Sequence, residues 1–163
     1  MSADQARVTV AVRVPPEAAF EIFTAEIDRW WRRGLKFRQA GQKRGLIHLE
    51  PRVGGRLFEE FDADGGRQVL VVGRVRTWDP PVKLAFSWRN VNFAPEELTD
   101  VEVEFCAIAS GTRVTVTHRG WSNLRAEHPA RHGLADAEFI GMKARWWGEQ
   151  LSALREYALN PRS

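Results

Sequence analysis

The feature of this chain that most constrains its fold is a series of short alternating segments followed by one long helical stripe. Between residues 45 and 119, six segments alternate apolar and polar side chains, and residues typical of turns separate them. The expected strands are 45–50, 56–62, 67–78, 82–90, 98–108 and 112–119. Because the connections are short, consecutive strands are expected to pair antiparallel, as a meander.

The two ends of the chain complete this layout. Residues 8–14 alternate and predict a first strand, and Pro15-Pro16-Glu17 predicts the start of a short helix. A second short helical piece carries Trp30 and Trp31. From 136 to 159, apolar residues recur every three or four positions, which predicts a long amphipathic helix. Its stripe consists of Ile140, Ala144, Trp147, Leu151, Leu154 and Ala158.

These elements predict an α+β fold in which a strongly curved antiparallel sheet wraps around the C-terminal helix. The chain has 163 residues and shows no repeat, low-complexity tract or linker, so residues 1–163 are expected to form a single domain. It contains seven tryptophans and nine phenylalanines but one tyrosine. Such rings fill wide spaces between a sheet and a helix, and they also line hydrophobic ligand sites.

Many of these rings fall on one face of the expected sheet. With a period of two, the inward positions of three strands are Leu84-Phe86-Trp88, Val101-Val103-Phe105 and Val114-Val116-His118, and Trp121 follows the last strand. This face is either a packed core or the wall of a cavity. His118 accordingly has three interpretations, namely a neutral core histidine, a polar anchor for a ligand, or a general acid and base.

Glu59 is the candidate partner for His118. If Leu57 points inward, so does Glu59, and a buried carboxylate then requires His118, an arginine or water beside it. The competing register points Phe58 and Glu60 inward instead. Adjacent tryptophans pose a similar question, and we expect one of Trp30 and Trp31 to pack under the sheet while the other covers a pocket entrance.

Positive charge is concentrated in residues 29–44, although the net charge is only +3. Between Asp28 and Glu50 the segment has no acidic residue, and its cations are Arg29, Arg32, Arg33, Lys36, Arg38, Lys43 and Arg44. The segment is either a solvated surface or a contact for an acidic ligand or protein. No motif for reading nucleic acid accompanies it, so we expect no nucleic-acid partner.

Several classes of site and location are not expected. Cys106 is the single cysteine, which excludes an internal disulfide. The histidines His48, His118, His128 and His132 lack a recognised metal spacing, so we expect neither a metal nor a cofactor. No signal-peptide core or run of about 18 apolar residues is present, which predicts a cytoplasmic protein without membrane insertion.

Motifs along nearly the whole chain, taken in order, resemble a known family. They are Val14-Pro15-Pro16-Glu17, Trp30-Trp31, Pro51-Arg52-Val53-Gly54-Gly55-Arg56, Gly73-Arg74-Val75, Trp78-Asp79-Pro80-Pro81, Leu84-Ala85-Phe86-Ser87-Trp88 and the segment from Gly111 to Gly120. The family is the START/Bet v 1-like (SRPBCC) superfamily, in the AHSA1-like branch named after the C-terminal domain of the activator of Hsp90 ATPase. The resemblance implies a helix-grip fold, in which the gap between sheet and last helix is often occupied by a ligand.

The resulting functional prediction is a protein that binds an apolar or amphipathic small molecule between the sheet and the C-terminal helix. The predicted apolar walls are Phe23, Trp31, Leu57, Phe86, Trp88, Phe105 and Trp121, and the predicted polar anchors are Glu59 and His118. Two alternatives remain open. One is a chaperone-interacting or other protein-interaction module that uses residues 29–44, and the other is a cyclase- or hydrolase-type enzyme that uses His118 and Glu59. A monomer and a homodimer are both compatible with the sequence.

Overall fold

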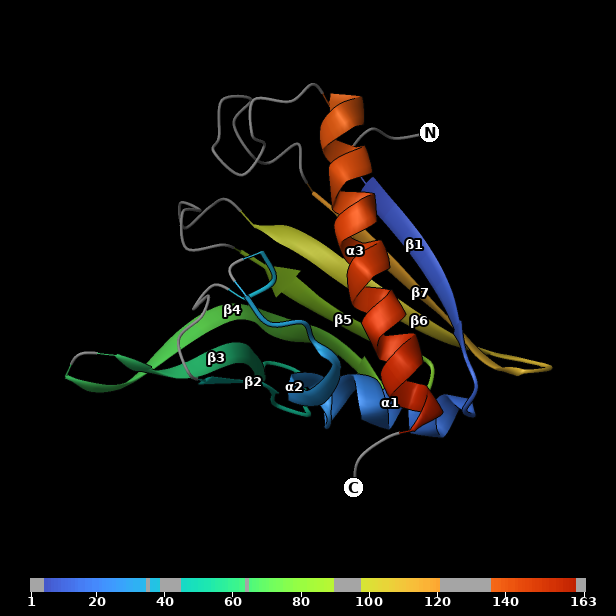
Figure 1. Ribbon diagram of the computed structural model, residues 1–163, viewed down its shortest axis with the longest axis horizontal. Coiled ribbons are helices and arrows are strands. Elements are labelled where there is room, and N and C mark those ends of the chain that lie inside the picture. Colours follow the sequence, from blue (N-terminus) through green and yellow to red (C-terminus); the bar gives the residue numbers. More distant parts are fainter. Residues whose placement is uncertain are drawn as a thin grey trace.

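The computed structural model describes residues 5–34, 36–38, 45–63, 65–89, 98–120 and 136–160. Within these ranges, seven strands form one antiparallel sheet that curls around the long helix α3 (Figure 1). The elements in chain order are β1 (Gln5–Val12), α1 (Pro16–Thr24), α2 (Ile27–Trp30), β2 (Gly45–Leu49), β3 (Arg56–Ala63), β4 (Gly66–Asp79), β5 (Lys83–Trp88), β6 (Thr99–Ile108), β7 (Gly111–Arg119) and α3 (Asp136–Leu159). The predicted fold class, a curved sheet gripping a C-terminal helix, is confirmed.

The strand order is β1-β7-β6-β5-β4-β3-β2, so β2 to β7 form the predicted meander. The first strand adds to the far edge beside the last one, and Gln5 pairs with Arg119 while Val12 pairs with Thr112. The sequence predicted this strand at 8–14. The strand instead runs from Gln5 to Val12, because it pairs with β7 from Arg119 to Thr112.

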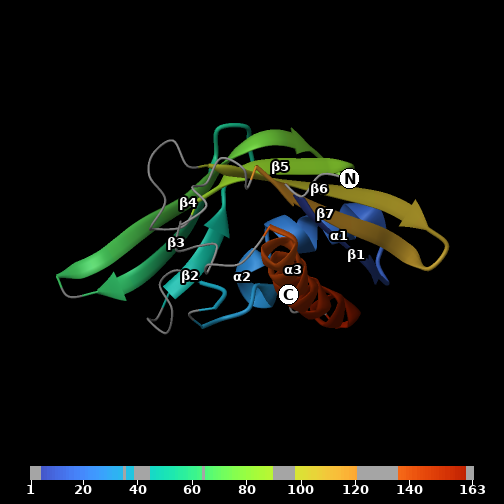
Figure 2. The ribbon, with the colours of Figure 1, turned by 90° about the horizontal axis from the view of Figure 1, so that it is seen from above.

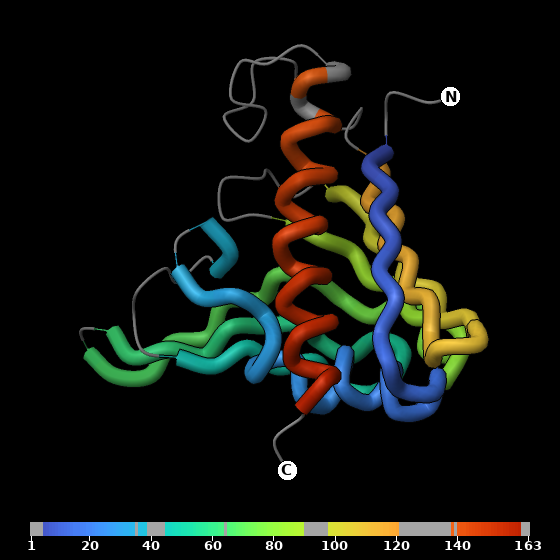
Figure 3. The backbone as a smooth tube through the Cα atoms, turned by 45° about the vertical axis from the view of Figure 1, so that its right-hand side comes forward, coloured from blue at the N-terminus to red at the C-terminus, as the bar shows by residue number. Residues whose placement is uncertain are grey.

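The helices lie on the concave side of the sheet. Seen from above, the sheet arches over α2 and α3 (Figure 2). The tube view shows α3 running alongside β1, with α1 and α2 near the C-terminal end of α3 (Figure 3). The predicted alternating face is the inner face of this arch, because Phe86, Val101, Val103, Val114 and Val116 are all buried in the core.

Helix α3 buries the stripe that its spacing predicted over most of its length. Trp147, Leu151, Leu154 and Ala158 are buried, and Trp146 and Gln150 are buried beside them. A stripe of this width packs against a concave sheet because both faces are continuous and apolar. None of the described helices is both long enough and apolar enough to span a membrane.

The prediction for the adjacent tryptophans Trp30 and Trp31 is wrong, because both are buried, with 3% and 2% of their surfaces exposed. Helix α2 ends at Trp30, and Trp31 has extended backbone with φ −65° and ψ 122°. Even so, the two rings pack against each other in the core, with centroids 5.5 Å apart. The indole of Trp30 donates to the carbonyl of Phe23 in α1, whereas that of Trp31 donates to the carbonyl of Phe37.

Candidate functional site

His118 lies on the inner face of β7, where its alternation with Val114 and Val116 predicted it, and it is fully buried. Its Nδ1 accepts a hydrogen bond from Nε1 of Trp147 on α3, over 3.0 Å. Its Nε2 lies 2.8 Å from Oγ1 of Thr99 on β6, and that hydroxyl donates to the carbonyl of Trp88 on β5. The indole is only a donor, so Nδ1 of His118 is the acceptor and Nε2 carries the proton.

Aromatic rings surround His118 in the space between the sheet and α3. The ring of Trp31 stacks on that of Trp88 with centroids 5.8 Å apart, and Trp146 and Trp147 pack against both at steep angles. His118 itself meets Trp88 and Trp147 edge-on at 6.0 Å. In the described part of the chain, these side chains occupy the location where the sequence suggested a cavity.

The electrostatic surroundings keep His118 neutral. Burial lowers its pKa well below the ordinary value of 6.5, and the positive charge of Lys143 lowers it further. Burial also lowers the pKa of Lys143 to about 8, and its ammonium lies 4.5 Å from the centre of the Trp146 ring. A neutral imidazole with both nitrogens in hydrogen bonds is a connector between elements. To act as a base it would first have to release Trp147.

Glu59 points inward, as the register with Leu57 inward predicted, since Leu57 is fully buried and 3% of Glu59 is exposed. Its negative charge acts on Arg38, whose pKa it raises against the larger lowering by burial. Which of His118, an arginine or water contacts this carboxylate stays a prediction. Strands β4, β5 and β6 lie between β3 and β7 in the sheet, so Glu59 and His118 come from well-separated strands.

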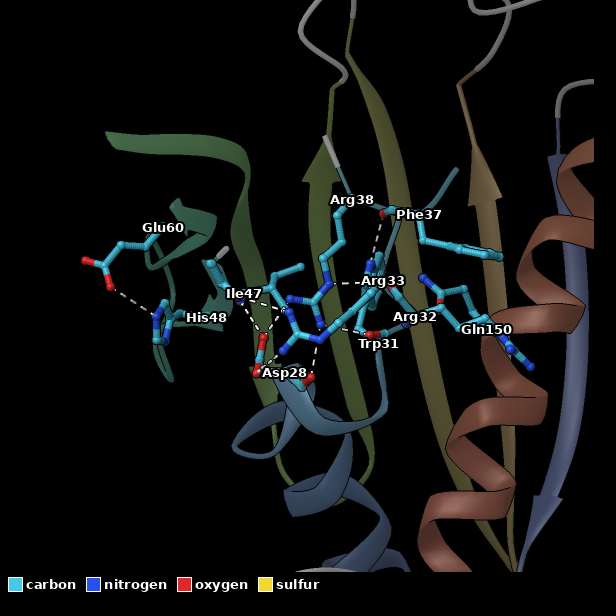
Figure 4. Close-up of polar contacts among 11 residues, drawn as sticks. Asp28, Trp31, Arg32, Arg33, Phe37, Arg38, Ile47, His48, Glu60 and Gln150 are labelled. Carbon is cyan, nitrogen blue, oxygen red and sulfur yellow. Dashed lines mark hydrogen bonds and ion pairs between the residues drawn. The ribbon is translucent and has the colours of Figure 1, made fainter. Parts of the chain in front are cut away.

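Arg38 belongs to the basic segment but is buried, with only 4% of its surface exposed. Its guanidinium donates to Oδ1 of Asp28 at 2.7 Å and to the backbone carbonyls of Asp28, Trp31 and Arg32 (Figure 4). The same carboxylate oxygen accepts from the backbone N–H of Ile47 in β2. Through Asp28, Arg38 therefore holds the chain after α2 against the edge strand β2.

Other cations of the segment also contact the protein. Arg33 pairs with Asp28 at 3.2 Å, and Lys36 pairs with Glu149 of α3 at 2.9 Å. Arg32 donates through Nε to the carbonyl of Glu149. Lys43 and Arg44 lie outside the described residues. The basic surface predicted from residues 29–44 is thus reduced by the burial of Arg38 and by contacts with Asp28 and α3.

A pocket that the sequence did not predict lies at the end of the molecule beside α1. It has a volume of about 660 Å3 and opens between α1 and the chain reversals that follow β2 and β4. Most of its walls are apolar, and its lining residues are Glu17, Phe20, Glu21, Thr24, Ala25, Leu49, Pro51, Trp78, Pro80 and Pro81. The pair of prolines 80 and 81, joined by a cis peptide bond, forms one wall.

Phe20 separates this pocket from the core. Its ring meets Trp78 edge-on at 5.1 Å and lies 5.1 Å from Phe105. The opposite wall at Pro51 belongs to a turn that Glu50 closes, since its carboxylate accepts from the backbone and the guanidinium of Arg56. The sequence signal for this pocket is the motif Trp78-Asp79-Pro80-Pro81, which by itself does not predict a ligand site.

The residues predicted to bind a ligand do not line this pocket. Phe23, Trp31, Leu57, Glu59, Phe86, Trp88, Phe105 and His118 are all buried, and Trp121 lies outside the described residues. Their role in ligand binding stays a prediction. In the described ranges there is no group of three or more histidine, cysteine, aspartate or glutamate residues arranged to hold a metal.

Comparison with known families gives a match over most of the chain. The family model described as "Activator of Hsp90 ATPase homolog 1-like protein" matches residues 13–158. No curated protein matches the sequence.

Solved structures share the fold at low sequence identity. The protein MLL2253 from Mesorhizobium loti is 18% identical with a TM-score of 0.63, covering 98% of this chain and 99% of that one. The Aha1 dimer from Colwellia psychrerythraea is 15% identical with a TM-score of 0.62, covering 98% of both chains. PFC0360w, an HSP90 activator from Plasmodium falciparum, is 20% identical with a TM-score of 0.61, covering 98% and 99%. At these identities the similarity establishes the helix-grip fold alone.

Proposed function

Because this chain belongs to the family of activator of Hsp90 ATPase homolog 1-like proteins, whose model spans residues 13–158, we propose that it is a helix-grip domain that binds an apolar or amphipathic small molecule. The observation that carries this proposal is the open apolar pocket beside α1. Its volume of about 660 Å3 lies within the range of roughly 300–1,000 Å3 that is usual for small-molecule sites.

The walls of the pocket favour binding because they are already in place. Phe20 is held between Trp78 and Phe105, and the prolines at 51, 80 and 81 have almost no side-chain freedom to lose. A ligand would be stabilised by roughly 25 cal/mol for each Å2 of apolar surface that it buries, before the cost of its own ordering. A preorganised wall keeps the cost on the protein side small.

The nine residues predicted from the sequence offer a second location for the same function, between the sheet and α3. A ligand there would have to separate the rings of Trp31, Trp88 and Trp147, and it would compete with the bonds that already occupy both nitrogens of His118. Binding at this location therefore carries an opening cost, which binding in the pocket beside α1 avoids.

Binding can be tested with the neutral fluorescent probe N-phenylnaphthylamine. Ala25 is exposed and lines the pocket, so Ala25→Trp should fill it and weaken binding at least about tenfold. Ala107→Trp is the matched control, because it places the same ring on an exposed position of β6 outside the pocket. Trp88→Phe examines the location between the sheet and α3.

Each outcome identifies a location or removes the proposal. Weaker binding in the Ala25 variant alone supports the pocket beside α1. Weaker binding in the Trp88 variant alone moves the ligand to the core beneath α3. Failure of the wild-type protein to bind any neutral apolar probe would overturn the proposed function.

A second candidate function is contact with a protein partner, favoured by the relative described as an HSP90 activator. The exposed cations Arg29, Arg33 and Lys36 would supply the contact with an acidic surface. Reversing these three charges should abolish a salt-sensitive interaction with purified Hsp90, whereas reversing the exposed Arg145 of α3 should not. Equal binding by both variants would remove this candidate.

A further inference from the structure

The pocket beside α1 combines apolar walls with two carboxylates at its rim. Glu17 and Glu21 lie four residues apart, so they share one face of α1 with Ala25, and all three line the pocket. Among the residues that the structure describes, no lysine and no arginine line the pocket. The charge that an occupant meets at this pocket is therefore negative.

Several carboxylates on the surface pair with a neighbouring cation, whereas in the described part of the chain these two do not. Glu50 pairs with Arg56, Glu60 with Arg67, and Glu102 with Lys83. Within the described residues, neither Glu17 nor Glu21 makes an ion pair or a side-chain hydrogen bond, and both are exposed. The chain has more cations than acidic groups, 24 against 21, yet none of the described cations neutralises this rim.

The position of Glu21 is unfavourable for the isolated helix. It lies in the last turn of α1, which has no basic residue, and the negative end of a helix disfavours a carboxylate there. Like charges four residues apart on a helix also repel each other. Glu17 lies in the first turn, where the helix end favours it, so the unfavourable charge is mainly that of Glu21. A cation bound at the rim would relieve both effects.

We infer that the ligand of this pocket is a cationic amphiphile, with its ammonium group at Glu17 and Glu21 and its apolar body against Phe20, Leu49 and Trp78. This inference rests on the proposed function and narrows its ligand class. The apolar body is buried between the aromatic wall and the prolines, while the head group stays at the open rim. The indole of Trp78 lies in the same wall, and an indole face also attracts ammonium groups.

The test uses three compounds with one octyl chain and different head groups: octyltrimethylammonium, octyl glucoside and octyl sulfate. Each competes with N-phenylnaphthylamine at concentrations below its micelle point. At low salt the ammonium compound should displace the probe at least about tenfold more readily than the sulfate. The preference should shrink as salt is added, because the carboxylates are exposed and their charges are screened.

Variants test whether Glu17 and Glu21 cause the preference for the ammonium head group. The double variant Glu17→Gln with Glu21→Gln should reduce the preference for the ammonium compound over the sulfate below about threefold, because both negative charges are removed. Glu138→Gln with Glu156→Gln is the matched control, because it removes two exposed carboxylates of α3 outside the pocket. Thermal unfolding of each variant establishes that the fold is intact.

The outcomes distinguish the cationic ligand class from the proposed binding of apolar molecules in general. If octyl glucoside binds but head-group preference is absent, or survives in the Glu17 and Glu21 double variant, the cationic ligand class is wrong and apolar binding stands. If neither the neutral nor the cationic compound competes with the probe, and the probe itself does not bind, both fail together.

Discussion

The indole of Trp147 on α3 donates a hydrogen bond to Nδ1 of His118 on β7, and this 3.0 Å bond joins the long helix to the sheet at the centre of the core. The other ring nitrogen of His118, Nε2, lies 2.8 Å from the hydroxyl of Thr99. That hydroxyl donates a hydrogen bond to the carbonyl of Trp88. One imidazole thus connects α3 with three neighbouring strands. A neutral ring is required, because protonated Nδ1 could not accept from Trp147.

The first prediction concerns pH. The pKa of His118 is well below 6.5 in the folded protein, so between that value and 6.5 the unfolded chain binds more protons. The stabilisation from neutral His118 is complete above pH 6.5 and decreases as the pH falls. We expect this group to lower the free energy of unfolding by up to about 1.4 kcal/mol per pH unit. Denaturant unfolding between pH 5 and 8 measures the slope, which should be smaller in His118→Gln; equal slopes would contradict the prediction.

The second prediction compares two adjacent tryptophans of α3. Trp147→Phe leaves Nδ1 of His118 without its donor in a dry core, whereas Trp146→Phe frees the half-buried carbonyl of Lys36. Both changes remove the same atoms, so the loss of ring volume is matched. We expect Trp147→Phe to cost about 1–3 kcal/mol more in the free energy of unfolding. Equal losses in urea melts would show that the bond to His118 contributes little.

The third prediction concerns the clamp at Arg38. Arg38→Met should lower the free energy of unfolding by about 3–5 kcal/mol, because it leaves Asp28 and three backbone carbonyls without their buried donor. Arg33→Met removes the exposed partner of the same carboxylate and should cost about 1 kcal/mol or less. Chemical denaturation of both variants makes the comparison. Similar, small losses would mean that Arg38 is not a structural clamp.

The fourth prediction contrasts two glycines. A Cβ at Gly73 of β4 would overlap the carbonyl of Ser87 in β5, where the strands approach closely. Gly148 of α3 has nothing within 4 Å of its Cβ position. Gly73→Ala should therefore destabilise the protein by at least about 2 kcal/mol. Gly148→Ala should stabilise it by up to about 1 kcal/mol. Calorimetric Tm values should move in opposite directions, and a neutral Gly73→Ala would contradict the packing described.

The fifth prediction concerns the turn beside the pocket. Hydrogen bonds from the side chain and the backbone of Arg56 lower the pKa of Glu50 from 4.5 to about 2. Arg56→Gln should raise this pKa, although not fully, because the backbone N–H still donates. Arg52→Gln should raise it less, since Arg52 is 3.8 Å from the carboxylate. Carboxyl carbon shifts in an NMR titration measure each value. Titration of wild-type Glu50 near 4.5 would contradict the geometry.

Most of the elements could be predicted because their patterns are local. The alternation in 112–119 indicates that His118 points inward. For Glu59 the alternation left two registers open, and the structure has the one with Leu57 inward; His118 and Glu59 are both buried. The stripe from Trp147 to Ala158 likewise marks the buried side of α3. For β7 and α3 the periodicity of one segment decides which side meets the core, without reference to any distant residue.

The partners of these inward residues could not be predicted in the same way. Arg38 reads as one cation in a basic segment, and its burial depends on Asp28 and on the backbone carbonyls that surround it. Trp30 and Trp31 are both buried because α2 ends between them. The pocket beside α1 combines residues from α1, β2 and the turn after β4, which meet only in three dimensions.

The sequence by itself determined the order of the strands and helices and the apolar faces of β7 and α3, because side-chain period and turn residues act over a few positions. The tertiary structure alone decided which side chains the aromatic face of the sheet contacts. The curl of the sheet brings α3 over β7, so Trp147 donates a hydrogen bond to His118 and packs against the rings of Trp31 and Trp88. It also leaves the apolar pocket on the outer side of Phe20. That division depends on sheet curvature and on where each helix ends, which are set by contacts between residues far apart in the chain.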